Sequence, residues 1–141
     1  MWDALNIAGS GANVDQTWID TIGGNVANME DGVTPGQPVY QAEYPVVTAE
    51  GEPGDSVADG GSPVSADGVQ VTGVELGPAQ GQQEYDPTNP LADAQGEVTY
   101  PVVDLGSEMT QLIESQTSYQ ANSSVMSHAT TAYQAILDMK V

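Results

Sequence analysis

A short stretch of oxygen-bearing side chains is the first place in this sequence where chemistry could occur. Asp86, Asn89, Asp93 and Glu97 offer carboxylate and amide oxygens, which are the ligands that Ca²⁺ prefers. Their spacing does not match the ligand series of a calcium-binding EF-hand loop. The residues between them include two prolines and a glycine, which are typical of turns. We therefore interpret these side chains as turn-forming, and the sequence predicts no metal site.

Other candidate residues lack the partners that their chemistry needs. His128 is the only histidine and the chain has no cysteine, so a zinc site and a thiol nucleophile are both unsupported. Asn122-Ser-Ser124 matches a glycosylation acceptor, but it lies within a predicted helix. Gly9-Ser-Gly11 does not follow a strand, as a phosphate-binding loop does. With no nucleophile and base, and no pair of acids, we expect no enzyme, no cofactor and no small-molecule substrate.

The charge balance narrows the range of partners. The chain carries twenty acidic residues against the single Lys140, a formal net charge of −19. Phosphate contacts need lysine or arginine, so nucleic acids and anionic membrane surfaces are poor partners. No apolar run approaches a membrane span, and the N-terminus lacks the features of a cleaved signal peptide. We expect that any export proceeds without a cleaved signal peptide.

The elements that must position any site are two helices at the ends of the chain. The run from Leu105 to Lys140 contains no proline, and its apolar residues recur at steps of three and four, which predicts a helix about 50 Å long. Asp104 is placed to cap its N-terminus, and Glu108 and Lys140 suit the two ends of the helix dipole. A helix longer than a small domain needs for its core is expected to have partners along its length.

The first thirty residues show the same period but contain four helix-weakening glycines. Gly9, Gly11, Gly23 and Gly24 lie inside the pattern, and each destabilises a helix by about 0.8–1 kcal/mol relative to alanine. We hypothesise that this helix is weakly structured in the free subunit and becomes stable when it docks on the C-terminal helix and on neighbours. An ordinary two-helix packing within one subunit is the alternative.

Between the helices the pattern changes to extended structure. Residues 39–48, interrupted by Pro45, are typical of an edge strand. Residues 69–76 alternate around Gly73, which predicts a strand with a bulge, and residues 98–102 alternate again. Residues 49–68 hold almost nothing to bury, which predicts a mobile acidic loop.

The predicted fold class is therefore α+β. Residues 1–30 form an N-terminal helix and residues 104–141 form a C-terminal helix, both in an inner helical layer. Residues 31–103 form a β-rich insertion with the acidic loop 49–68. The two helices are predicted to be long, antiparallel and coiled-coil-like, so that both chain ends lie together.

Several short motifs carry a resemblance to a known family. Leu5-Asn-Ile-Ala-Gly-Ser-Gly11, followed by Gly24-Asn-Val-Ala-Asn28, is similar to the N-terminal signature of bacterial flagellar rod and hook proteins. Further motifs resemble the proximal rod proteins of that family. They are Pro38-Val-Tyr40, Asp86-Pro-Thr-Asn-Pro-Leu-Ala-Asp93, Pro101-Val-Val-Asp104, Glu108-Met109 and Ser118-Tyr-Gln-Ala-Asn122.

The resemblance implies a structural subunit of the flagellar basal body. Such subunits pass unfolded through the flagellar type III export apparatus, without a cleaved signal peptide. They then polymerise through their terminal helices into the periplasmic rod, a tube that transmits torque. The implied partners are copies of the chain, other rod proteins, the membrane (MS) ring and the rod-ring adaptor. Relatives often carry an arginine at Thr117 and an asparagine at Val102, so any salt bridge through that arginine is absent here.

The residues expected to form the assembly interface are the apolar stripes of both helices, with five polar residues that could set their register. The apolar set is Leu5, Ala8, Ala12, Ile19, Ile22, Val26, Met29, Leu105, Met109, Leu112, Met126, Tyr133 and Ile136. The polar set is Asn25, Asn28, Tyr119, Gln120 and Asn122. Helix-end capping by Asn28, and an exposed polar face for Gln120 and Asn122, are the simpler alternatives. Another rod subunit, or a secreted acidic binding module that forms a closed dimer, would also fit the sequence.

Overall fold

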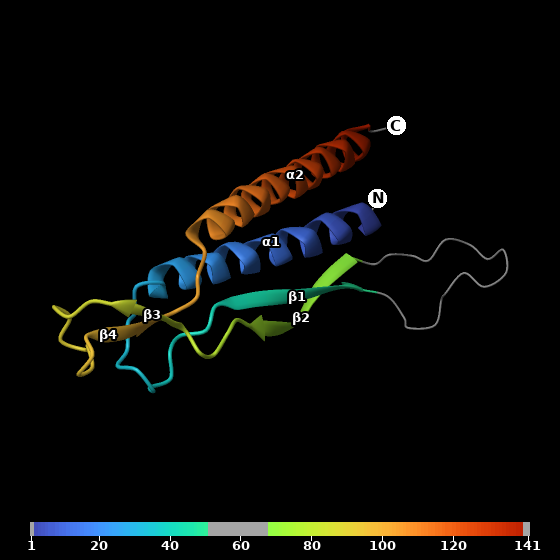
Figure 1. The fold of residues 1–141 in the computed structure, drawn as a ribbon. Helices are drawn as coiled ribbons and strands as arrows, with labels where there is room; N and C mark the ends of the chain where they lie inside the picture. Colours follow the sequence, from blue (N-terminus) through green and yellow to red (C-terminus); the bar gives the residue numbers. More distant parts are fainter. Residues whose placement is uncertain (1, 51–67, 140–141) are drawn as a thin grey trace.

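Two antiparallel helices and two short antiparallel sheets make up the structure (Figure 1). A computed structural model describes residues 2–50 and 68–139 of the 141-residue chain. The elements in chain order are α1 (Trp2–Asn28), β1 (Glu43–Glu50), β2 (Gly68–Leu76), β3 (Gln82–Tyr85), β4 (Glu97–Tyr100) and α2 (Leu105–Asp138). The predicted α+β class is confirmed. Among the described residues, no helix is long and apolar enough to cross a membrane.

The two helices lie side by side with opposite directions (Figure 1). Asn25, near the end of α1, contacts Glu108 in the first turn of α2, whereas Asp15 contacts Asn122 farther along. The described ends of the chain therefore lie together, as predicted. The Asp104 carboxylate accepts a hydrogen bond of 2.9 Å from the backbone amide of Ser107, which confirms the predicted cap of α2.

The hairpin of β1 and β2 runs along α1 (Figure 1). It is tied to α1 at both ends: the Ser10 hydroxyl accepts from the Val69 amide at 3.1 Å, and the Asn25 side chain bonds the backbone of Glu43. The register shifts between Val46 and Val47, which pair with Gly73 and Val71. The extra residue lies on β2 beside Gly73, so the predicted bulge is confirmed.

The second sheet pairs β3 with β4 and lies near the end of α1. The turn between these strands uses its carboxylates internally. Asp86 Oδ1 accepts from the amide and the hydroxyl of Thr88, and Asp93 Oδ1 accepts from the amides of Gln95 and Glu97. The bond from the Thr88 hydroxyl is the main cause that lowers the pKa of the Asp86 carboxyl. The turn-forming interpretation is confirmed for Asp86, Asn89 and Asp93, whereas Glu97 is the first residue of β4.

Some predicted boundaries differ from the structure. The first strand begins at Glu43 rather than at residue 39, and residues 49, 50 and 68 belong to strands rather than to the acidic loop. Residues 51–67 of that loop, and Lys140, lie outside the described residues. Strand β3 was not predicted, because its sequence Gln82-Gln-Glu-Tyr85 shows no apolar alternation.

The buried apolar core consists of small side chains. Apart from Ile22, its buried apolar members in the described residues are alanines and valines: Ala8, Ala12, Val14, Val39, Ala42 and Val98. Burial of a large apolar side chain stabilises a protein by about 1.5–3 kcal/mol, and alanine contributes much less. The subunit therefore depends strongly on its buried polar contacts.

Candidate functional site

The contact between the helices is close because α1 presents small residues to α2. A Cβ atom added to Gly11 would lie 2.8 Å from Asn122 Nδ2. That absence of a side chain lets Asn122 donate a hydrogen bond of 2.9 Å to Asp15 Oδ2, and Asp15 is 9 % exposed. A hydrogen bond to a buried carboxylate is stronger than one between neutral groups. The pair of Asp15 and Asn122 therefore fixes the register of the helices within the subunit.

Replacing Gly11 with alanine is expected to break this register contact. The new methyl group must displace the Asn122 amide, which removes its bond to Asp15. Gly23 is the matched control, because a Cβ atom there meets nothing within 4 Å. Gly23→Ala should stabilise the subunit by about 0.8–1 kcal/mol through helix propensity alone. Urea unfolding followed by circular dichroism compares the two, and an equal gain from Gly11→Ala would contradict the role assigned to Gly11.

Asn25 joins three elements at the other end of the helix pair. Its side chain is 0 % exposed. Its Oδ1 accepts from the Tyr40 hydroxyl and from the Glu43 amide, both at 2.9 Å, and its Nδ2 donates to the Glu43 carbonyl at 2.9 Å. Nδ2 also lies 3.3 and 3.4 Å from the two carboxylate oxygens of Glu108. We call these four residues the Asn25 junction.

Glu108 is the buried acid of this junction. It is 1 % exposed, although the sequence suggested only a favourable position near the helix dipole. Burial raises the pKa of its carboxyl, the bond from Asn25 opposes that rise, and the negative charge of Asp104 adds to it. The described part of the chain contains no lysine or arginine that could balance the charge. Burial, followed by nearby carboxylates that include Glu108, also raises the pKa values of Tyr40 and Tyr44.

Replacing Glu108 with glutamine is expected to make the stability of the subunit less sensitive to a rise in pH above 4.5. A carboxyl whose pKa is higher in the folded chain binds a proton on folding. Its contribution to stability is complete below the ordinary pKa of 4.5 and is lost as the pH rises through the folded pKa. Glu108→Gln removes that loss. The variant should be more stable than the wild type at pH 7.5, and the difference should shrink toward pH 4.5.

Glu114→Gln is the matched control for this comparison. It removes the same charge from the same helix, but Glu114 is exposed. Urea titrations across the pH range should therefore show a pH-dependent gain for Glu108→Gln alone. Identical pH profiles for the two variants would mean that burial of Glu108 is not the cause.

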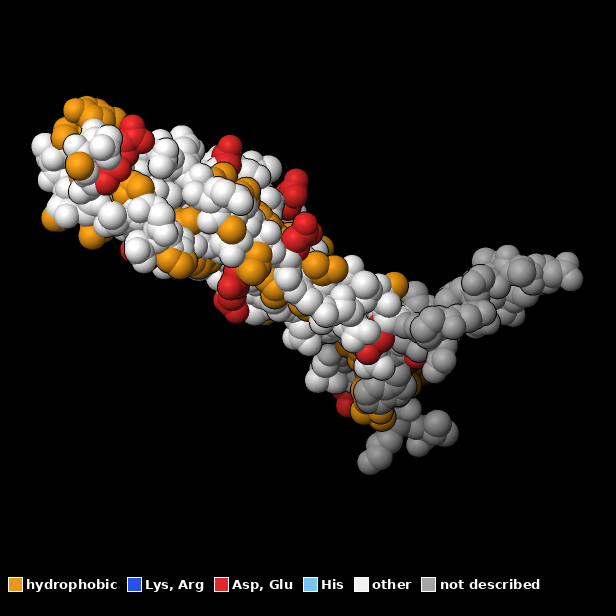
Figure 2. Space-filling view, turned by 60° about the horizontal axis from the view of Figure 1, so that its bottom comes forward, with side chains coloured by type: hydrophobic (Ala, Val, Ile, Leu, Met, Phe, Trp, Pro, Cys, Tyr) orange, Lys and Arg blue, Asp and Glu red, His pale blue; other side chains and the backbone are white. Residues whose placement is uncertain are grey.

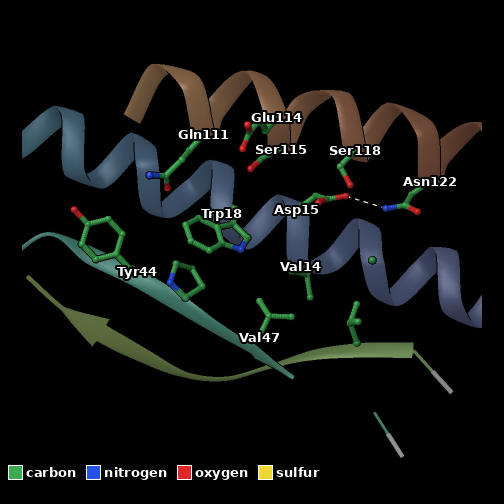
Figure 3. A pocket seen from close by; sticks show the side chains of 13 residues that line it. Val14, Asp15, Trp18, Tyr44, Val47, Gln111, Glu114, Ser115, Ser118 and Asn122 are labelled. Atoms are coloured by element: carbon green, nitrogen blue, oxygen red, sulfur yellow. Dashed lines mark hydrogen bonds between the residues drawn. The ribbon is translucent and has the colours of Figure 1, made fainter. Parts of the chain in front are cut away.

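A groove lies between the two walls that flank α1 (Figure 3). Its volume is about 730 Å³. Trp18 of α1 lies at its centre, Tyr44 and Val47 of β1 form one wall, and Gln111 and Glu114 belong to the α2 wall (Figure 3). The full lining is Gly11, Val14, Asp15, Trp18, Tyr44, Pro45, Val47, Val69, Gln111, Glu114, Ser115, Ser118 and Asn122. We call it the Trp18 groove.

The second half of α2 is largely uncovered. Between residues 123 and 138 only Met126 and Ala129 are partly shielded. Val125, Ile136 and Leu137 are 47, 55 and 63 % exposed. Residues 115–137 contain no aspartate, glutamate, lysine or arginine. On the face of the molecule shown in Figure 2, groups of apolar side chains alternate with carboxylates, and no basic side chain is visible. This stretch is therefore an uncharged surface of apolar and small polar side chains in a strongly acidic chain.

The structure divides the predicted assembly residues into two groups. The first group is buried or partly buried within the subunit and consists of Leu5, Ala8, Ala12, Ile19, Ile22, Asn25, Val26, Asn28, Met29, Leu112, Asn122 and Met126. The second group is exposed and consists of Leu105, Met109, Tyr119, Gln120, Tyr133 and Ile136.

The contact line of α2 within the subunit explains this division. It runs through Glu108, Ser115 and Asn122, one heptad apart, so Leu105 and Met109 lie beside it. The Asn28 amide bonds the carbonyl of Gly24 one turn back, which fits helix-end capping. The assembly role of both groups stays a prediction.

Sequence reasoning missed Trp18 and the groove around it. A second face of α1 is formed by residues at steps of three and four, namely Gly11, Val14 and Trp18. That spacing was a usable signal for a further contact surface. The position of the hairpin opposite this face had no comparable local signal, because it depends on the long-range bonds of Ser10 and Asn25.

Comparison with known proteins concerns the last third of the chain. Residues 94–139 match the family described as the flagellar basal body rod FlgEFG protein C-terminal region. The match includes β4, the Asp104 cap and all of α2. No curated protein matches the chain. This part of the chain is thus similar to flagellar rod proteins, which are structural and not enzymatic.

Proposed function

We propose that this protein is a structural subunit of the flagellar basal-body rod. The observation that carries the proposal is the match of residues 94–139 to the C-terminal region of rod proteins. The uncovered second half of α2 supports it, because a structural subunit needs surface that is buried only on assembly. Both observations support self-assembly through α2, and we extend this proposal to α1 because α1 packs along α2.

Within the rod, we propose the proximal position, as in the proximal rod protein FlgC. The short insertion between the helices and the series Asn89-Pro-Leu-Ala-Asp93 support this choice over another rod subunit. In that position the protein would form part of a helical drive shaft across the periplasm. It would transmit torque from the membrane ring toward the distal rod and hook, after export from the cytoplasm through the type III export apparatus. Its neighbours would be copies of itself, other rod proteins, the membrane ring and the rod-ring adaptor.

Electron cryomicroscopy of isolated basal bodies tests this function. We expect α1 and α2 to line a tube next to the membrane ring, with the two small sheets on the outside. Density for the chain farther along the rod would replace the proximal assignment by another rod subunit. A chain that is absent from the rod, and that runs in solution as a closed dimer, would overturn the rod function in favour of an acidic binding module.

A further inference from the structure

The Trp18 groove has the character of an unoccupied binding surface for a helix. Trp18 and Val47 are large apolar side chains at its floor and wall, and both remain partly exposed in the subunit. On the α2 wall, Gln111 Oε1 is buried and has no hydrogen-bond partner in the described residues. That oxygen is enclosed within the subunit, so the exposed apolar area of the groove, rather than this atom, is what a bound partner would cover.

The charge of the groove restricts what can enter it. Asp15 and Glu114 belong to its lining, and the described chain has no basic residue to offset them. A partner segment that carries carboxylates would be repelled. In this chain, residues 115–137 are the longest stretch without an ionised acidic or basic side chain. Its outer, exposed side is therefore the part of a second copy that can approach the groove most easily.

One side of α2 has the right pattern for this contact. Val125, His128, Ala132 and Ile136 are spaced by three, four and four residues, so they share one helix face, and all four are exposed. We call them the outer face of α2. Three of them are apolar and match Trp18 and Val47. His128 offers a ring N–H to a wall that contains the exposed carboxylate of Glu114.

We propose that the Trp18 groove of one subunit binds the outer face of α2 from a second copy of the chain. This inference rests on the proposed rod function and names the contact that joins its subunits. Groove and helix face are different surfaces of the same molecule, so the contact is head-to-tail. Such a contact continues into an open helical array rather than closing into a dimer.

Two variants with opposite defects test the proposal. Val47→Asp places a charge in the groove, and Ile136→Asp places one on the outer face of α2. Each variant keeps one intact surface. We expect each variant alone to need at least a tenfold higher protein concentration to assemble than the wild type. An equimolar mixture of the two should form a 1:1 heterodimer that does not grow further. Leu91→Asp is the control. Leu91 is 44 % exposed in the turn before β4, so the substitution adds the same charge outside both surfaces.

Fluorescence of Trp18 supplies an independent signal. In a Trp2→Phe background Trp18 is the only tryptophan, and its emission should move to shorter wavelength as subunits assemble. Assembly of the full-length protein is followed by sedimentation in about 1 M KCl, where charge repulsion is screened. The Leu91→Asp variant should assemble and shift like the wild type.

The outcomes separate this inference from the rod function. If the chain polymerises while Trp18 emission stays unchanged, or while both aspartate variants assemble normally, the groove contact is wrong and the rod function stands. If Trp18 shifts only when another rod protein is added, the occupant is that protein and not a second copy. If the chain never self-associates and is absent from basal bodies, both the contact and the function fail.

Discussion

Replacing Asn25 with alanine is expected to destabilise the subunit by about 3–5 kcal/mol, because each buried polar group left without a partner costs about 1–3 kcal/mol. The alanine leaves the amide and carbonyl of Glu43 without partners and removes the only side-chain donor to Glu108 in the described residues. Water cannot easily replace these bonds, because Asn25 and Glu108 are 0 and 1 % exposed. Urea unfolding followed by circular dichroism at constant salt measures the loss.

Asn28→Ala is the matched control for the Asn25 junction. Asn28 lies one turn further along the same helix and is partly exposed, and its amide bonds the carbonyl of Gly24. Loss of one such bond should change stability by about 0.5–1.5 kcal/mol. If the two alanine variants unfold at the same urea concentration, the junction does not hold the helices and the hairpin together.

The size of this effect follows from the composition of the core. A core of alanines and valines provides little apolar burial, so a single buried polar junction is a large part of the net stability. Natural domains are stable by only about 5–15 kcal/mol. The Asn25 junction also connects α1, the start of β1 and the first turn of α2. Its loss is therefore expected to unfold the whole subunit rather than one element.

Local patterns were sufficient to predict the helices. The apolar period of 3.6 and the Asp104 cap depend on residues a few positions apart, and α1 and α2 were predicted to within a few residues of their ends. The bulge beside Gly73 was predictable for the same reason. Strand β3 was missed because it gains its conformation only by pairing with β4, and its own residues are polar.

Two of the polar residues that were predicted to set the register make contacts within the subunit, and these contacts were not predictable from the sequence. Asn25 and Asn122 were expected to set the register between subunits. The structure shows that Asn25 bonds Glu43 and that Asn122 bonds Asp15, both within one subunit. Sequence identifies an amide beside an apolar stripe, but it does not say which chain provides the partner. The burial of Glu108 was missed because a glutamate in a first helix turn is usually exposed.

These contacts change how the N-terminal helix is understood. We hypothesised that its four glycines weaken it until it docks. The absence of a side chain at Gly11 has a structural reason, because the Asn122 amide occupies the space that a side chain would need. The space beside Gly23 is open. Part of the helix weakness therefore serves close packing, and the rest stays consistent with a helix that is easily unfolded for export. NMR spectra of the dilute monomer test the weak-helix hypothesis directly.

Raising the salt concentration is expected to increase both the stability and the assembly of this protein strongly. The net charge of −19 has no internal compensation, because the described residues include no lysine or arginine. Two carboxylates about 10 Å apart repel each other by about 0.4 kcal/mol in water. Summed over neighbouring pairs, this repulsion reaches the order of several kcal/mol, and assembly of copies adds to it. At about 1 M salt the screening length falls to about 3 Å, which removes most of the repulsion.

Unfolding and sedimentation should therefore be measured from about 0.05 M to 2 M KCl, with sucrose as the control. Sucrose stabilises folded proteins by exclusion from their surface but does not screen charge. We expect KCl to raise the urea midpoint at concentrations where sucrose of equal osmolality has little effect, and to lower the concentration needed for assembly. Equal responses to the two solutes would mean that charge repulsion is not the limiting term. In that case the absence of charged side chains from residues 115–137 would have to be explained by packing and not by the avoidance of charge repulsion.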